Sequence, residues 1–188
     1  PLHASVSGAH LHEALVHART KRTAAWPTPS AYASDATIVL IGMRASGKSH
    51  VGQRLAGLLH RTFLDADEVF AQLHGDLGAY VQSFGWDAFR EAEAQILASL
   101  ISHHPTGHVL ALGGGVVEYA PSRALLAHVR EQVGPVVHIV RSYEAISAFL
   151  ATSDRPAYGE PLSDVYARRL PLYARAVSYT HLRAHETR

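Results

Sequence analysis

Residues 37–49 read TIVLIGMRASGKS, an apolar run that breaks into glycine and ends on a lysine and a hydroxyl. The apolar part is typical of a strand buried on both faces of a parallel sheet. The remainder fits G-x-x-x-x-G-K-[ST], with the fixed positions at Gly42, Gly47, Lys48 and Ser49. In this pattern, backbone N–H groups and a helix N-terminus cradle phosphates, the lysine reaches the β/γ-phosphates, and the hydroxyl ligates Mg²⁺. The stretch predicts a nucleotide-phosphate site rather than a glycine turn with a surface lysine.

Length and composition indicate one α/β domain around one core, because the chain has 188 residues and 47% hydrophobic content. The formal net charge is +1 and the basic residues are scattered, so neither nucleic acid nor a membrane is expected as the main partner. The chain has no cysteine, no apolar run near the ~20 residues that span a bilayer, and no signal-peptide pattern at its start. A soluble cytoplasmic protein is the resulting expectation.

Histidine is frequent, with fourteen residues, and this raises a metal hypothesis. The spacing does not favour it, because His103 and His104 are adjacent at the end of a predicted helix and the others occur singly. Solvent-facing histidines are the favoured interpretation.

Three segments of different character divide the chain. Residues 1–35 mix proline with small residues without a period and are interpreted as a disordered linker. Residues 36–176 carry the periodic patterns of a domain. Residues 177–188 have no apolar period and resemble a translated sequencing adaptor, so we leave them out of the predicted fold. A start at proline suggests that the domain was cut from a longer polypeptide.

Strand and helix patterns alternate after the opening stretch. Helical patterns recur along residues 51–59, 67–74, 87–102, 116–129, 142–151 and 165–176, and short strand patterns occupy residues 62–64, 108–112 and 134–140. This order predicts a mostly parallel sheet with helices on both faces.

Two carboxylates, Asp65 and Asp67, follow the strand pattern at residues 62–64. Ligands of open α/β sheets bind outside the carboxyl ends of the strands. Two residues apart on an extended segment, the two side chains should point to opposite sides, so one carboxylate is expected to face a metal and the other a substrate. A helix N-cap with a neighbouring solvated acid is an equally good interpretation of the pair alone.

Arginines and glycines supply the remaining candidates. Arg90 lies near the start of the helix at 87–102 and, taken singly, is more simply a surface charge. Gly113 to Gly115 end the strand at 108–112, where glycine permits close backbone approach and positive φ, although a flexible loop would also fit. Residues 152–165 form a polar loop typical of a lid and carry Arg155, and Arg168 and Arg169 follow.

With these residues placed, the chain resembles the shikimate kinase family and, more narrowly, the shikimate kinase domains of fungal pentafunctional AROM polypeptides. Five motifs carry the resemblance beside the phosphate loop GMRASGKS: FLDAD, GWDAFREAE, HPTGHVLALGGGVVE, DRPAY and RRLPLY. The resemblance implies a three-layer fold like those of P-loop NTPases and nucleoside monophosphate kinases, with strand order 2-3-1-4-5. The family's fifth strand should follow Ala176, so we expect it to be missing or replaced here.

The resemblance also implies a role for each matching residue. Phosphorylation of the 3-hydroxyl of shikimate would use ATP and Mg²⁺, with catalytic roles for Lys48, Asp67 and Arg155. Metal binding would fall to Ser49 and Asp65. Shikimate would be bound by Asp67, Arg90, Gly113, Gly114, Gly115 and Arg169, with Glu93 orienting Arg90. ATP would be held by Gly42, Arg44, Ala45, Ser46, Gly47, Lys48, Ser49 and His50.

Partners and alternatives follow from the same resemblance. Other domains of an AROM-like polypeptide are expected in cis. A second hypothesis is a ligand-sensing module, since related domains occur in fungal repressors, and a third is another small-molecule P-loop kinase such as a gluconate kinase. Ala45, where the family usually has glycine, and a short lid are departures from the family pattern.

Overall fold

The structure is a computed structural model, and it describes residues 32–152, 159–177 and, for the backbone only, 179–183. Five parallel strands form one sheet in the order β2-β3-β1-β4-β5. The strands are β1 (Ile38–Ile41), β2 (Thr62–Asp65), β3 (His108–Ala111), β4 (Val136–Val140) and β5 (Tyr179–Arg183). The helices are α2 (Lys48–Leu59), α3 (Ala66–His74), α4 (Leu77–His103), α5 (Ala120–His128), α6 (Tyr143–Ala151) and α7 (Leu162–Ala176), with short turns η2 (Val116–Glu118) and η3 (Val129–Val133).

The central strand β1 is buried on both faces, as its apolar run predicted. Val39 and Ile41 belong to one core cluster, and Leu40 between them belongs to the other. This alternation follows from the two-residue period of a strand, which sends successive side chains to opposite faces.

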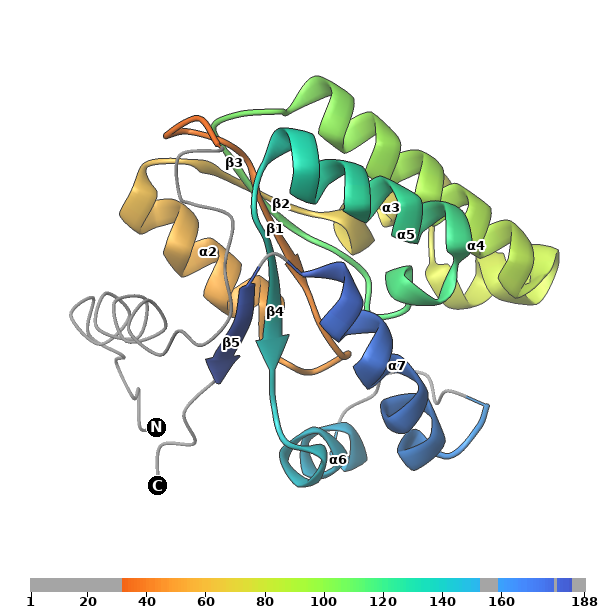
Figure 1. Ribbon diagram of the computed structural model, residues 1–188. Helices are drawn as coiled ribbons and strands as arrows, with labels where there is room; N and C mark the ends of the chain where they lie inside the picture. Colours follow the sequence, from red (N-terminus) through yellow and green to blue (C-terminus); the bar gives the residue numbers. More distant parts are fainter. Residues whose placement is uncertain (1–31, 153–158, 178, 184–188) are drawn as a thin grey trace.

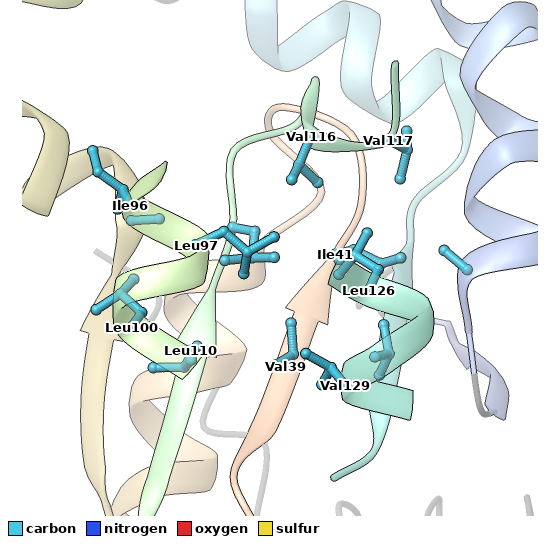
Figure 2. Packing of buried hydrophobic residues seen from close by; sticks show 14 of the residues in the cluster. Val39, Ile41, Ile96, Leu97, Leu100, Leu110, Val116, Val117, Leu126 and Val129 are labelled. Atoms are coloured by element: carbon cyan, nitrogen blue, oxygen red, sulfur yellow. The ribbon is translucent and has the colours of Figure 1, made fainter. Parts of the chain in front are cut away.

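Helices cover the two faces of the sheet unequally (Figure 1). On one face, Leu55 and Ala56 of α2 pack with Leu40 in the smaller cluster. On the other, α4, α5 and α7 enclose the larger cluster, part of which is seen from close by in Figure 2. The fold is therefore three layers, and the predicted α/β class and strand order are confirmed.

The fifth strand corrects the treatment of the tail. Residues 177–188 are left out of the predicted fold, yet Tyr179–Arg183 among them pair in parallel with β4. This fits the prediction that the family's fifth strand is replaced, and it corrects the exclusion of the tail. Strand β5 lies at the edge of the sheet, with β4 as its one neighbour among the described strands.

Two helices begin earlier in the chain than the sequence pattern predicts. Helix α4 begins at Leu77, ten residues before the predicted start, and passes through Gly85 in a non-helical conformation (φ 82°, ψ 169°) that separates its two parts. Helix α7 begins at Leu162, inside the predicted lid, and contains Pro171. Within the described residues, no helix is both long enough and apolar enough to cross a membrane.

The last residues of the predicted linker, Ser34 and Asp35, form hydrogen bonds with the domain. Arg61 donates to the carbonyl oxygen of Ser34 at 2.8 Å, and Gly107 N donates to that of Asp35 at 2.7 Å. Residues 1–31 of the predicted linker lie outside the described residues.

Two glycines of α2 provide a matched stability test. A methyl group at Gly52 would overlap the Phe63 ring and lie 3.1 Å from Leu40 Cδ1, whereas one at Gly57 would meet nothing within 4 Å. We expect Gly52→Ala to lower the free energy of unfolding by about 1–3 kcal/mol through overpacking. Gly57→Ala should raise it by about 0.5–1 kcal/mol through helix propensity. Urea denaturation measures both, and equal shifts in the two variants would contradict the packing of α2 on β2.

Candidate active site

A cavity of about 660 Å³ opens at the carboxyl ends of β1, β2 and β3. Most of the predicted site residues line it: Arg44, Ala45, Gly47, Lys48, Ser49, His50, Asp65, Asp67, Arg90, Gly113, Gly114, Gly115 and Arg169. Gly42 and Ser46, which belong to the phosphate loop itself, are buried and do not line the cavity. Arg155 lies outside the described residues.

The loop between β1 and α2 has the backbone of a phosphate cradle. Gly47 caps the N-terminus of α2 in a left-handed conformation (φ 94°), so the first free N–H groups of the helix face the loop. Lys48 Nζ donates to the carbonyl oxygens of Gly42 at 3.1 Å and Met43 at 3.0 Å, which holds the ammonium over the loop. The sequence VLIGMRASGKS therefore places a cation and a helix N-terminus at one point, which suits an anionic phosphate chain.

Ala45 adopts a left-handed conformation with φ 65°. For a residue with a Cβ this conformation costs about 1–2 kcal/mol, and glycine would avoid that cost. Arg141 NH1 donates to the carbonyl oxygen of Ala45 at 2.9 Å and so helps to hold the loop in this shape. The departure from the family pattern is thus accommodated without loss of the loop.

Ser49 and Asp65 bring two oxygen ligands together at the end of the loop. Ser49 Oγ donates to Asp65 Oδ2 at 2.6 Å, while Asp65 Oδ1 accepts from Asp67 N at 3.0 Å as the N-cap of α3. Asp65 can therefore be a helix N-cap through one oxygen and a metal ligand through the other. Among the described residues, no group of three or more His, Cys, Asp or Glu is placed to hold a metal ion. A hydroxyl and one carboxylate suit Mg²⁺, which keeps several waters and takes its other ligands from substrate phosphates.

Asp67 follows Asp65 by two residues and is the second residue of α3. The two aspartates do not share one extended segment as predicted, because β2 ends at Asp65 and α3 begins at Ala66, so Asp67 is helical. A methyl group at Gly113 would lie 3.0 Å from Asp67 Oδ1 and would overlap Glu93 Oε1. Glycine at this position thus lets two carboxylates approach the end of β3.

Arg90 of α4 is enclosed on several sides. Its NH1 bonds Glu93 Oε2 at 2.8 Å, and its guanidinium carbon lies 5.5 Å and 5.2 Å from the Trp86 and Phe89 ring centres. A methyl group at Gly115 would overlap the same guanidinium. Positive φ is found at none of the three glycines of the triplet, so close approach is the reason for glycine here.

Glu93 is a buried carboxylate, with 7% of its surface exposed. Burial raises the pKa of the Glu93 carboxyl above its ordinary value, although the charge and hydrogen bond of Arg90 act against that shift. Its Oε1 has no hydrogen-bond partner in the described part of the chain. Glu93 therefore fixes Arg90 through one oxygen, as the family resemblance implied.

Arg169 of α7 meets a carboxylate that we did not single out from the sequence. Its NH2 donates to Glu118 Oε2 at 2.6 Å, and Arg90 NH2 approaches the same oxygen at 3.4 Å. Arg168, the other arginine of the pair, donates from Nε to Glu118 Oε1 at 2.8 Å. The motif HPTGHVLALGGGVVE ends on Glu118. An acid three residues after the glycine triplet is therefore the feature of the sequence that could have marked Glu118 as a site residue.

Arg141, Trp86 and Phe149 also line the cavity without having been predicted. Arg141 follows β4 directly and its guanidinium carbon lies 5.6 Å from the Phe149 ring centre. Its position at the carboxyl end of a strand could have identified Arg141 as a candidate site residue, because the other site residues lie at that edge of the sheet.

The family model for shikimate kinase matches residues 44–188. The chain belongs to the shikimate kinase family. A pentafunctional AROM polypeptide of Malassezia globosa is 64% identical over 177 residues, 93% of this chain, and one of Mycosarcoma maydis is 52% identical over 154 residues, 80% of this chain. These matches cover 11% and 9% of the two relatives, so the chain spans about a tenth of their length.

Solved shikimate kinases share the fold. The Acinetobacter baumannii enzyme in complex with shikimate is 31% identical, with a TM-score of 0.73 over 81% of this chain and 86% of that one. Shikimate kinase from Aquifex aeolicus, at 24% identity, has a TM-score of 0.65 over 80% of this chain and 88% of that one. Membership of this family implies use of a nucleotide, and the phosphate loop described above is where it would bind.

Proposed function

We propose that this domain transfers the γ-phosphoryl group of ATP to the 3-hydroxyl of shikimate. The observation that carries the proposal is that a phosphate loop, a carboxylate and a pair of arginines all line one cavity. The relative from Acinetobacter baumannii, which has the same fold, was solved in complex with shikimate.

The acceptor would be held by its carboxylate. Arg90 and Arg169, here named the carboxylate clamp, share Glu118 Oε2 as an acceptor and therefore lie close to one another. Guanidinium groups in this arrangement can donate parallel hydrogen bonds to a small anion, with strength and directionality that one ammonium lacks. The amides of Gly114 and Gly115 would add contacts at the floor of the cavity.

Asp67 would act at the other end of the acceptor. Its carboxylate lines the cavity with Lys48, and it would orient the 3-hydroxyl and accept its proton as the oxygen attacks phosphorus. Little covalent work is required of the protein in phosphoryl transfer, so positioning and charge neutralisation carry most of the rate enhancement.

The donor would be bound by the phosphate loop. The contributing residues are Gly42, Arg44, Ala45, Ser46, Gly47, Lys48, Ser49 and His50. Ser49 and Asp65 would hold Mg²⁺, which supplies neutralisation of phosphate charge when it is bound. Arg155 would close over the γ-phosphate from the lid; that role stays a prediction because the residue lies outside the described part of the chain.

We further propose that the domain from residue 36 through β5 acts as one domain of an AROM-like polypeptide, with the other domains as partners in cis. The two AROM relatives, which extend far beyond the matched region, support this.

A coupled assay of ADP release tests the function. With ATP and Mg²⁺, we expect ADP formation that saturates with shikimate and that gluconate does not support. A sensing module would bind shikimate without shikimate-dependent ADP release. Turnover with gluconate instead would favour a different small-molecule kinase.

A further inference from the structure

Glu118 is held in place by more than its side chain. It ends the η2 turn, whose Val116 and Val117 are almost fully buried. Its N–H donates to Gly115 O at 2.9 Å, and Arg123 NH1 donates to its carbonyl oxygen at 2.8 Å. The backbone of this acid is therefore fixed directly beside the glycine triplet.

The side chain of Glu118 divides its two oxygens between different arginines. Oε2 accepts from Arg169 NH2 at 2.6 Å and, more weakly, from Arg90 NH2 at 3.4 Å. One oxygen shared by two guanidinium groups sets the distance between them and reduces the repulsion between their like charges. Without this anion, both arginines would have to be placed by their other contacts.

The other oxygen of Glu118, Oε1, connects to Arg168 of α7 and through it to Glu160, which precedes that helix. It accepts from Arg168 Nε at 2.8 Å, and the two terminal nitrogens of Arg168 bond both oxygens of Glu160 at 2.8 and 2.6 Å. The Arg168–Glu160 pair is exposed and contributes little by itself. The Glu118–Arg169 pair is different, because only 5% of the Arg169 side chain is exposed.

Glu118 is ionised under assay conditions near neutral pH. Partial burial favours the neutral form, but hydrogen bonds and charges from Arg169 and Arg168 outweigh it and hold the pKa of Glu118 below its ordinary value. The charge needed to hold the guanidinium groups is thus present where the kinase would work.

We propose that Glu118 is a positioning residue for the carboxylate clamp. It sets the spacing of Arg90 and Arg169 for an incoming monocarboxylate, and through Arg168 it links them to the segment that precedes α7. This inference rests on the proposed function, in which the clamp binds the shikimate carboxylate.

Steady-state kinetics of Glu118→Ala and Glu118→Gln test it. We expect Glu118→Ala to raise the KM for shikimate about 10- to 100-fold, as for loss of a hydrogen bond to a charged group, with the KM for ATP changed less than about twofold. Glu118→Gln preserves the volume and one acceptor, so it should fold even if the alanine variant does not, and its KM should fall in between. Glu131→Ala, which removes an exposed acid paired with the adjacent Arg130, is the control and should leave both KM values unchanged.

A double-mutant cycle separates positioning from general stabilisation. If Glu118 acts through Arg169, Glu118→Ala in an Arg169→Ala background should raise the shikimate KM by less than about twofold further. Additive effects, a lower KM in Glu118→Ala, or equal changes for shikimate and ATP would each overturn the inference. If the unsubstituted chain shows shikimate-dependent turnover and the Glu118 variants match it, only this inference fails. If the unsubstituted chain shows none, the proposed function itself fails.

Discussion

Asp67→Asn is expected to reduce kcat for shikimate phosphorylation by about 10²- to 10⁴-fold, the range typical of a lost general base. The amide has nearly the same shape, so it can still line the cavity beside Gly113, but it cannot accept the proton of the attacking hydroxyl. The measurement is the rate of ADP release at saturating shikimate and ATP.

Nucleotide binding is the control for the Asp67 variant. The phosphate loop is built by Gly47, Lys48 and the start of α2, whereas Asp67 belongs to the first turn of α3, and asparagine at that position preserves the size of the side chain. Titration with a fluorescent ATP analogue should therefore give a dissociation constant within about threefold of the unsubstituted chain, well under 1 kcal/mol. Loss of ATP binding in Asp67→Asn, or retention of full turnover, would contradict the assigned role.

Arg90→Ala is expected to raise the KM for shikimate by about 30- to 150-fold, because charge-assisted hydrogen bonds to a carboxylate contribute about 2–3 kcal/mol. The KM for ATP should change far less, since the phosphate loop lies on a different element. Equal increases for the two substrates would argue against a carboxylate clamp.

A second variant guards against misfolding in that experiment. Arg90→Ala leaves the buried Glu93 without the guanidinium that bonds it, which can destabilise the domain. Gly115→Ala retains both Arg90 and Glu93 in the sequence and requires no unusual backbone conformation at φ −94°. Its methyl group would occupy the position of the Arg90 guanidinium, which would have to shift. It should raise the shikimate KM in the same selective manner. A Gly115→Ala enzyme with unchanged KM would contradict the position of Arg90.

The parts of the fold that could be predicted are those with a local signal. The β-branched run at Ile38–Ile41 and the glycine–lysine pattern after it predict a buried strand and a phosphate loop without any distant contact. Parallel strands place their carboxyl ends at one edge, and this was enough to bring Asp65 and Gly113–Gly115 to the same site.

The parts that could not be predicted depend on tertiary contacts. Glu118 is one acid among many in the sequence, and only the packing of α7 against the η2 turn brings Arg168 and Arg169 to it. Strand β5 has no apolar period in its sequence, and only its pairing with β4 places it in the sheet. Arg90 and Arg169 are far apart in sequence, so their shared acceptor has no local signature.

Identification of the product tests the central claim most directly. The chain would be incubated with ATP, Mg²⁺ and shikimate, and the products would be examined by phosphorus and proton NMR. The account predicts one new phosphate ester, coupled to the proton on carbon 3 of shikimate, formed in step with ADP. Free phosphate with unmodified shikimate, or an ester at another hydroxyl, would contradict it.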